Sequence, residues 1–192
     1  GSYLGEKGHF VDSIIKYGKI KNKMDINSNS VLYESDSSAN GLNMSLEYGY
    51  HKELAKDSYI EPQVEINYGH INSNSYRMKM NGANGAYVND DAINSFIGRI
   101  GINIGRKTTD GNVYAKLSVL REFNGDVGVT TNDGTYTRQS SENFKDTWAE
   151  YGIGFNKTIN SENNIYGEIT KTIGADKVKE KWKANIGFRK SF

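Results

Sequence analysis

The last eleven residues of the chain, Trp182-Lys183-Ala184-Asn185-Ile186-Gly187-Phe188-Arg189-Lys190-Ser191-Phe192, decide its fold. Apolar side chains keep one parity from Trp182 to Phe192. A period of two predicts a β-strand, because successive side chains of a strand point to opposite faces. Chain ends normally fray into solvent, so an apolar face that continues to the last residue is expected to dock against something. Closure of a β-barrel in lipid meets this requirement.

The overall composition is polar and excludes membrane helices. Hydrophobic residues make up 36% of the 192 residues, the mean hydropathy is -0.69, and no run approaches the ~20 apolar residues that a membrane helix needs. A membrane β-barrel has an equally low average, because only every second residue of a strand faces lipid. The absence of Cys, the single Pro, the 13 Tyr and the 21 Gly suit many strands with an aromatic girdle and no disulfide framework.

Charge and length limit the classes of protein further. The chain has 24 basic and 23 acidic residues, a net charge of +1, which gives no global attraction to nucleic acid. We predict no nucleic-acid partner and one domain over residues 1–192. The first residues contain no basic segment followed by an apolar stretch, so a signal peptide is absent from this sequence. An exported barrel is therefore expected to have further N-terminal sequence.

Seven more segments show the same alternation. The clearest runs from Leu42 to Tyr50, where apolar residues alternate with Asn43, Ser45, Glu47 and Gly49. With the C-terminal strand they make about eight predicted strands, so the fold class is all-β and antiparallel. The other six strands are predicted at residues 11–21, 60–68, 95–104, 113–119, 150–155 and 165–173.

Short and long connections alternate between these strands. Outer-membrane barrels have short periplasmic turns and longer extracellular loops. If the C-terminus is periplasmic, all the short turns are periplasmic as well, and the long polar stretches are extracellular loops. The short turns are residues 5–8, 51–58, 107–112 and 158–164, the long loops are residues 22–40, 72–91 and 124–145, and residues 174–181 are external but brief. The pattern predicts a transmembrane barrel of the bacterial outer membrane.

Residues 1–4 lead directly into the first turn, as the tail of an earlier strand would. An even-numbered barrel then requires more strands upstream. Two alternatives remain open. One is a complete eight-stranded barrel that acts as an adhesin or structural tether through its long loops. The other is a soluble β-sandwich, which would have to explain one continuous apolar parity without a second buried sheet face.

Three stretches resemble the C-terminal translocator domain of autotransporters, the bacterial type V secretion family. Residues 8–22 are similar to the family's strand after a periplasmic turn, Tyr59-Ile60-Glu61-Pro62-Gln63 is similar to a specific strand motif, and residues 165–192 are similar to the closing hairpin. The resemblance covers essentially the whole chain. It implies a barrel of twelve strands, of which about eight are expected here.

The resemblance also implies a function and partners. The implied function is that of an outer-membrane translocator and anchor, which takes part in delivering an N-terminal passenger to the surface of a Gram-negative bacterium. The implied partners are outer-membrane lipid, the chain's own passenger and the barrel-assembly machinery. The implied assembly signal consists of Trp182, Ile186, Phe188 and Phe192.

Charged residues on the parity opposite the apolar side chains are assigned to the barrel lumen. An Arg or Lys on the lipid face near the midplane would cost ~2 to 4 kcal/mol. The charges could hydrate the pore and hold a plug helix, or they could pair with one another across strands. The assigned residues are Asp12, Lys16, Glu47, Glu61, Glu65, Arg99, Lys116, Glu150, Glu168 and Arg189.

The remaining patterns favour structure over chemistry. Aromatic residues near the strand ends predict an interfacial girdle instead of a ligand platform; they are Tyr17, Tyr48, Tyr50, Tyr68, Phe123, Tyr151, Trp182 and Phe188. The three histidines lack an acid pair at fixed spacing, and Asn132-Asp133-Gly134 is a turn signal without the other calcium ligands. We therefore predict no catalytic residue, metal or cofactor.

Overall fold

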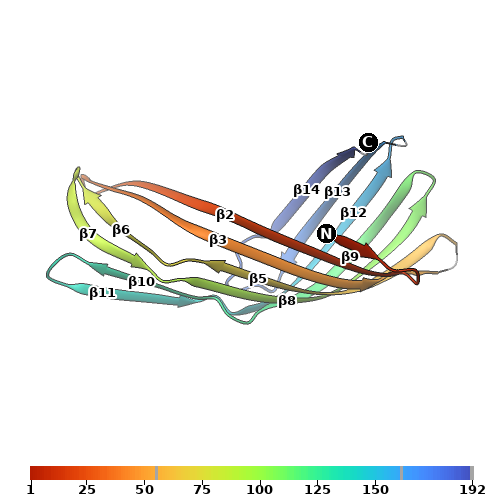
Figure 1. Cartoon of the computed structure of the whole chain (residues 1–192), viewed down its shortest axis with the longest axis horizontal. Helices are drawn as coiled ribbons and strands as arrows, with labels where there is room; N and C mark the ends of the chain where they lie inside the picture. Colours follow the sequence, from red (N-terminus) through yellow and green to blue (C-terminus); the bar gives the residue numbers. More distant parts are fainter. Residues whose placement is uncertain (55, 161, 191–192) are drawn as a thin grey trace.

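The computed structural model describes residues 1–54, 56–160 and 162–190, and these residues form one antiparallel sheet of 14 strands (Figure 1). None of the described residues forms a helix long and apolar enough to cross a bilayer. The strands are β1 (Ser2–Leu4), β2 (His9–Ser28), β3 (Val31–Tyr50), β4 (Lys52–Glu53), β5 (Ser58–Ile71), β6 (Asn74–Met80), β7 (Ala83–Asp90), β8 (Ile93–Thr108), β9 (Gly111–Glu122), β10 (Asp126–Asn132), β11 (Thr137–Asn143), β12 (Asp146–Thr158), β13 (Asn163–Ile173) and β14 (Trp182–Lys190).

The predicted strands are all present and pair in an antiparallel meander. They correspond to β2, β3, β5, β8, β9, β12, β13 and β14, which lie side by side in that order. Residues 1–4, expected as the tail of an earlier strand, contain β1, and β1 pairs with β2. The described residues contain a single sheet, which argues against a β-sandwich, because a sandwich needs a second sheet.

Register places the apolar side chains of neighbouring strands directly opposite one another. One row runs through Val64, Ile100, Val119, Ala149 and Ile173, each paired with the next across five consecutive strands. No other part of the chain that the structure describes covers this face, and 72% of the Ile100 surface is exposed. A continuous apolar face on the outside of a sheet needs an apolar environment.

The three long polar stretches, predicted as exposed loops, are largely built of paired strands, so the sheet has more strands than the eight predicted. β2 and β3 pair without interruption up to Ser28 and Val31, and the turn between them has φ of 49° at Asn29 and 64° at Ser30. The turn between β6 and β7 has φ of 49° at Asn81 and 78° at Gly82. Two-residue turns with positive φ match the twist of paired strands. Polar composition therefore did not exclude strands here.

These hairpins also pair with one another. Tyr33 of β3 lies opposite Met80 of β6, and Asp90 of β7 lies opposite Val129 of β10. The hairpins β2–β3, β6–β7 and β10–β11 extend together toward one end of the sheet, on the left in Figure 1. The predicted short turn at residues 51–58 contains β4, which pairs with β5. Residues 174–181 contain no strand.

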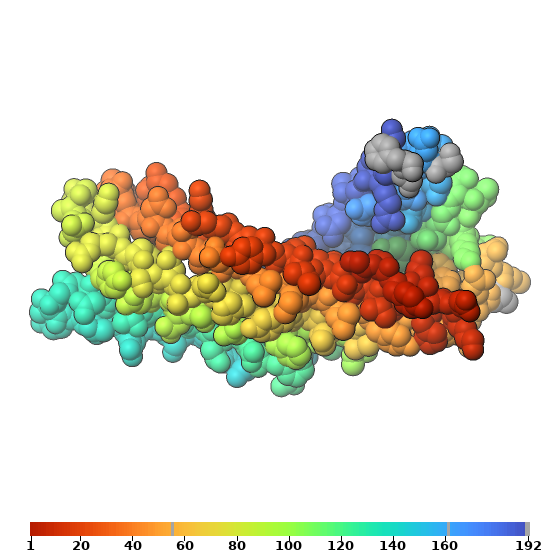
Figure 2. Space-filling model, viewed as in Figure 1, coloured from red at the N-terminus to blue at the C-terminus, as the bar shows by residue number. Residues whose placement is uncertain are grey.

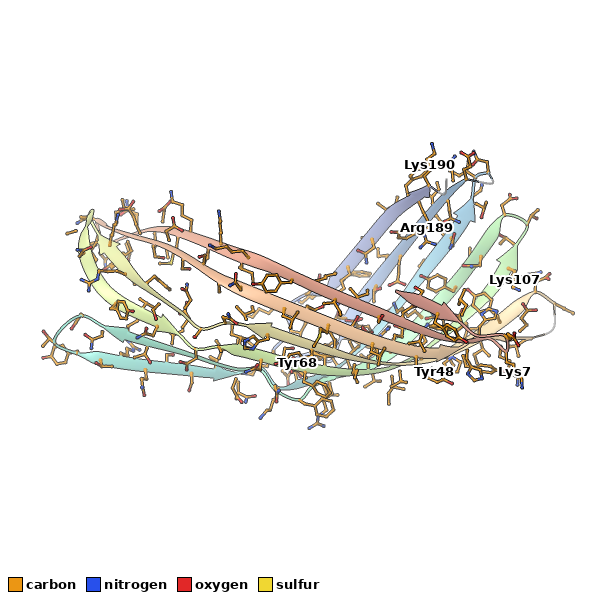
Figure 3. All side chains as sticks on the ribbon, in the orientation of Figure 1. Lys7, Tyr48, Tyr68, Lys107, Arg189 and Lys190 are labelled. Atoms are coloured by element: carbon orange, nitrogen blue, oxygen red, sulfur yellow. The ribbon has the colours of Figure 1, made fainter. Side chains whose placement is uncertain are left out.

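The sheet is strongly curved. β12, β13 and β14 rise steeply from the direction of β2 and β3 (Figure 1), and the space-filling view shows a deep notch between these two groups of strands (Figure 2). Lys7, Lys107, Arg189 and Lys190 lie at the end that carries the short turns (Figure 3). The two ends of the sheet therefore differ, because one has short turns and the other has long hairpins.

Candidate functional site

Three ion-pair networks lie on the face opposite the apolar rows, which we call the charged face. In the first, Glu47 of β3 lies directly opposite Glu65 of β5, and Glu65 lies opposite Arg99 of β8. Arg99 Nη2 lies 2.6 Å from Glu65 Oε2, and the same nitrogen also pairs with Glu47. One guanidinium thus pairs with two facing carboxylates, whose side chains are 19% and 22% exposed.

The second network is centred on Glu168 of β13. Lys116 Nζ of β9 lies 2.9 Å from Glu168 Oε1, and the Tyr114 hydroxyl donates to Glu168 Oε2 at 2.8 Å. The Thr170 hydroxyl donates to Oε1 at 3.2 Å. Glu168 therefore connects two strands that are separated by β12. The side chains can meet over β12 because residues 152 and 154, which lie between the partners, are both glycines and place no side chain in the way.

The third network joins the last strands. Lys183 Nζ of β14 lies 3.0 Å from Glu150 Oε1 of β12. The indole N–H of Trp148 donates to the same Glu150 oxygen at 3.3 Å. The Glu150 and Trp148 residues are buried. Lys183 was not among the predicted site residues, although its parity in the alternating C-terminal strand placed it on this face.

The other predicted charges are less connected. Glu61 Oε2 lies 3.3 Å from His51 Nδ1. Asp12 lies opposite Glu47, and Lys16 lies opposite Asn43. Arg189 lines a cavity of about 350 Å³ together with Glu61. Within the described residues, Asp12, Lys16 and Arg189 form no ion pair, whereas the other predicted charges pair with Lys, Arg, Asp or Glu, except Glu61, whose partner is the His51 imidazole.

Aromatic rings on the charged face cover glycines of the neighbouring strand, a feature that the sequence analysis missed. A Cβ atom built on Gly154 would overlap the Tyr114 ring, and a Cβ on Gly105 would overlap the Tyr59 ring. Tyr166 covers Gly187 in the same way. Only Gly permits this close approach. The signal in the sequence was a glycine on the polar parity of one strand opposite an aromatic residue of the next.

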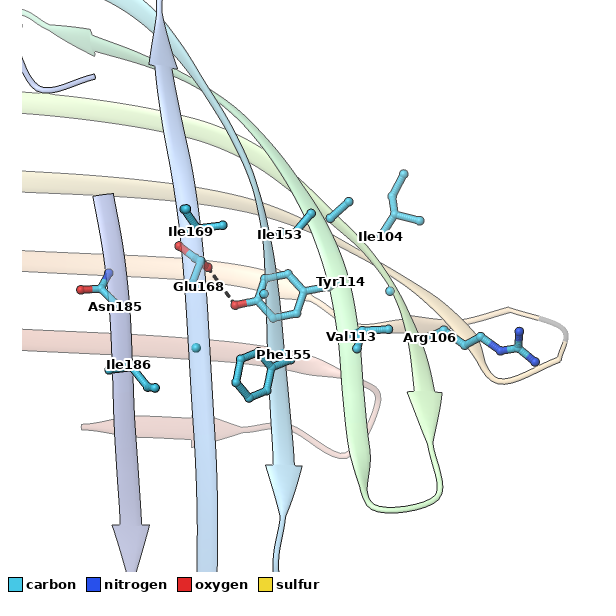
Figure 4. A pocket seen from close by; sticks show the side chains of 14 residues that line it. Ile104, Arg106, Val113, Tyr114, Ile153, Phe155, Glu168, Ile169, Asn185 and Ile186 are labelled. Carbon is cyan, nitrogen blue, oxygen red and sulfur yellow. Dashed lines mark hydrogen bonds between the residues drawn. The ribbon is translucent and has the colours of Figure 1, made fainter. Parts of the chain in front are cut away.

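The apolar face carries a shallow groove. Its volume is about 750 Å³, and Ile104, Val113, Ile153, Phe155 and Ile169 line it (Figure 4). The figure also shows the Tyr114–Glu168 hydrogen bond, which is made by residues of the other parity on the same strands. One strand thus presents an apolar groove on one face and a charged network on the other.

The predicted assembly signal lies on the apolar face of β14. Trp182, Ile186 and Phe188 are 59%, 82% and 61% exposed, so their side chains are largely uncovered. The only described strand that pairs with β14 is β13. Phe192 lies outside the described residues.

A carboxylate fixes the brief connection before β14. Asp146 Oδ2 accepts hydrogen bonds from the backbone N–H groups of Asp176, Lys177 and Val178, at 3.0, 2.8 and 3.4 Å. These donors, that of Lys177 first, hold the pKa of Asp146 below its ordinary value. The connection is therefore attached to the sheet without a strand of its own.

Comparison with known proteins gives the family. A family model described as the autotransporter beta-domain matches residues 1–170. The chain belongs to the autotransporter beta-domain family. Autotransporter beta domains translocate a passenger domain and anchor in the outer membrane. The family predicted from the sequence is therefore confirmed, together with the antiparallel all-β fold.

Relatives of this beta domain are autotransporters. It is 30% identical over 201 residues to the "Probable autotransporter YcgV" of Escherichia coli and 27% identical over 197 residues to the "BrkA autotransporter" of Bordetella pertussis. Each alignment covers 100% of this chain but only 20% and 19% of the relative, so the chain spans about a fifth of their length. The crystal structure of the BrkA beta domain has a TM-score of 0.72 and 22% identity, and the match covers 100% of this chain and 70% of that one.

Proposed function

We propose that this beta domain anchors its own N-terminal passenger in the outer membrane and takes part in its delivery to the cell surface, with the long hairpins outside and the short turns and C-terminus in the periplasm. The observation that carries the proposal is the register of the apolar face. Its rows continue from strand to strand, as in the row from Val64 to Ile173. Such a face is stable in lipid and unstable in water.

The charged face then lines an aqueous interior. The networks around Arg99, Glu168 and Glu150 support this assignment, because they place ionised groups where water can solvate them. Five of the ten predicted lumen charges pair with each other, and Glu61 and Glu150 lie beside the basic side chains of His51 and Lys183. We propose that pairing keeps the wall rigid, and that Asp12, Lys16 and Arg189 remain available to contact the polypeptide that passes.

We further propose that the chain has no catalytic role and needs no metal or cofactor. Two relatives are named "Serine protease EspC" and "Serine protease SepA autotransporter", and the matches cover 15% and 13% of these proteins. In our proposal, any chemistry of the present protein belongs to its passenger. Passenger identity would then vary while the barrel stays similar.

A matched pair of substitutions in the full-length protein tests the two faces. Ile100→Lys places a charge on the apolar face and is expected to cost ~2 to 4 kcal/mol if that face contacts lipid. Outer-membrane recovery of the protein and the amount of passenger released by protease from intact cells should both fall. Gln63→Lys places the same charge on the charged face of the neighbouring strand and should leave both amounts unchanged. Equal behaviour of the two variants would contradict the assignment of faces.

Epitope tags test the orientation. A tag between Asn81 and Gly82, at the tip of the β6–β7 hairpin, should bind antibody on intact cells. A tag after Asp110, in the turn between β8 and β9, should bind only after the outer membrane is permeabilised. The reverse labelling pattern would overturn the proposed orientation.

The edge strand β14 supports a role for the barrel-assembly machinery. An unpaired edge offers backbone donors and acceptors for strand addition, and the exposed Ile186 and Phe188 side chains give that edge an apolar face. A photo-crosslinking amino acid at Ile186 should capture a subunit of the machinery during assembly. The same amino acid at Asn185, on the charged face, is the control. Equal capture at both positions would show that the machinery does not specifically recognise the apolar face of β14.

A further inference from the structure

The apolar face carries cations at its two borders. On the last five strands of the meander, the residues of the apolar parity include two arginines and three lysines but no Asp or Glu, counted over the described strand residues. None of these cations lies in the middle of a strand. They are Arg106 in β8, Arg121 in β9, Lys157 in β12, Lys171 in β13 and Lys190 in β14.

The distance between the two borders matches a membrane. Arg106 lies opposite Val113 of β9, and Arg121 lies eight positions further along the same strand. Eight residues of strand span roughly 26 Å, and a strand tilt of about 40° reduces this to roughly 20 Å along the membrane normal. The apolar band of an outer-membrane barrel is about 25 Å tall. The cations therefore lie near both interfaces, where lipid phosphates are found.

Two of these cations rest on aromatic rings at the end with the long hairpins. Arg121 Cζ lies 5.4 Å from the centre of the Phe123 ring, and Lys171 Nζ lies 5.1 Å from the centre of the Trp182 ring. Neither cation forms an ion pair with a described carboxylate. The rings hold each charge at the interface and leave its hydrogen-bond donors free for an anion.

We propose that Arg121 and Lys171 bind the phosphates of lipid A in the outer leaflet. The proposal rests on the orientation given under Proposed function, which places these residues at the external interface. A cation at the border of the lipid-facing surface that has no carboxylate partner can pair with the phosphate groups of the headgroup layer. Charge-assisted hydrogen bonds to phosphate are strong. The acidic side chains that could compete are absent from the described apolar parity of the five strands.

The test measures lipid A binding to the full-length protein purified in detergent. The probes are lipid A with both phosphates and the same lipid A after removal of its phosphates, which keeps the acyl chains. The wild type should bind the phosphorylated probe more tightly. Arg121→Gln combined with Lys171→Gln should weaken that binding by about thirtyfold, which corresponds to roughly 1 kcal/mol for each cation. The difference should shrink with added salt.

The control removes equal charge elsewhere at the same end. Lys79→Gln combined with Arg138→Gln changes exposed residues of β6 and β11 and should keep wild-type affinity. Equal affinity of the wild type for both probes, or wild-type affinity of the Arg121 and Lys171 double variant, would overturn the proposal. Outer-membrane recovery and passenger exposure are measured on the same variants. If the wild type is not recovered from the outer membrane or does not expose its passenger, the proposed function is refuted. If the wild type delivers its passenger but shows no preference for the phosphorylated probe, only the lipid site is refuted.

Discussion

Replacement of Arg99 by Gln should destabilise the barrel by roughly 2 kcal/mol. Without the guanidinium, Glu47 and Glu65 face each other across the β3–β5 ladder with no other described cation within ion-pair distance. Directly opposed side chains lie about 5 Å apart, and two like charges at that distance repel by roughly 3 kcal/mol at an effective dielectric constant of about 20. That constant suits these side chains, which are 13% to 22% exposed. Contact with interior water reduces the repulsion somewhat.

The assay is the stability of the full-length protein in detergent, measured as the urea midpoint of its folded, fast-migrating gel form. A change of 2 kcal/mol alters the folding equilibrium by about thirtyfold. The second substitution Glu47→Gln in the Arg99→Gln background should restore part of the loss, because it removes one of the two repelling charges. The reasoning would be refuted if Arg99→Gln left the midpoint unchanged, or if Glu47→Gln lowered it further.

Two other predictions concern packing and pH. Gly154→Ala should lower the free energy of unfolding by about 1 to 3 kcal/mol, because the new Cβ displaces the Tyr114 ring. The control variant Gly18→Ala should change it by less than about 0.5 kcal/mol, because a Cβ there meets nothing within 4 Å. Similar urea midpoints for the two variants would contradict this prediction. The lowered pKa of Asp146 means that its stabilising contribution is present above the ordinary value of 3.8 and is lost as the pH falls through the lower folded value. Hydrogen exchange at residues 176–178, corrected for the intrinsic effect of pH, should therefore accelerate in acid. The variant Asp146→Asn should show fast exchange already at neutral pH, whereas the control variant Asp176→Asn should not. Exchange in the wild type that does not depend on pH after this correction would refute the argument.

Much of the meander could be predicted because the alternation of residue types within each strand shows which face is apolar and which is polar. The alternation from Leu42 to Tyr50 and in the C-terminal segment depends only on which residues are apolar, and both segments are strands with that face uncovered. The hairpin extensions could not be predicted in the same way. Residues 22–28 and 31–40 are mostly polar and their few apolar residues do not alternate regularly, so hydrophobic periodicity gave no signal. The Asn81-Gly82 pair was a usable turn signal, and it marks the tip of β6–β7.

The site, too, could be predicted from the sequence only in part. Parity alone placed Glu47, Glu65 and Arg99 on one face, but it did not reveal that they touch. Contact depends on register, which brings residues separated by 34 and 52 positions into one network. Tyr114 and Gly154 illustrate the same limit, since the ring needs a glycine that lies on another strand. Lys183 was missed although its parity was known, because its partner Glu150 is 33 residues away.

The sequence by itself determined which side of each strand is apolar, where the short turns lie, and which family the chain belongs to. These properties are local, because side chains alternate along a strand whatever its neighbours are. Tertiary structure alone decided which charges meet, which rings cover which glycines, and how the two cationic borders are separated across the sheet. Those properties depend on the pairing register and curvature of strands that are distant in sequence, and no single strand contains that information.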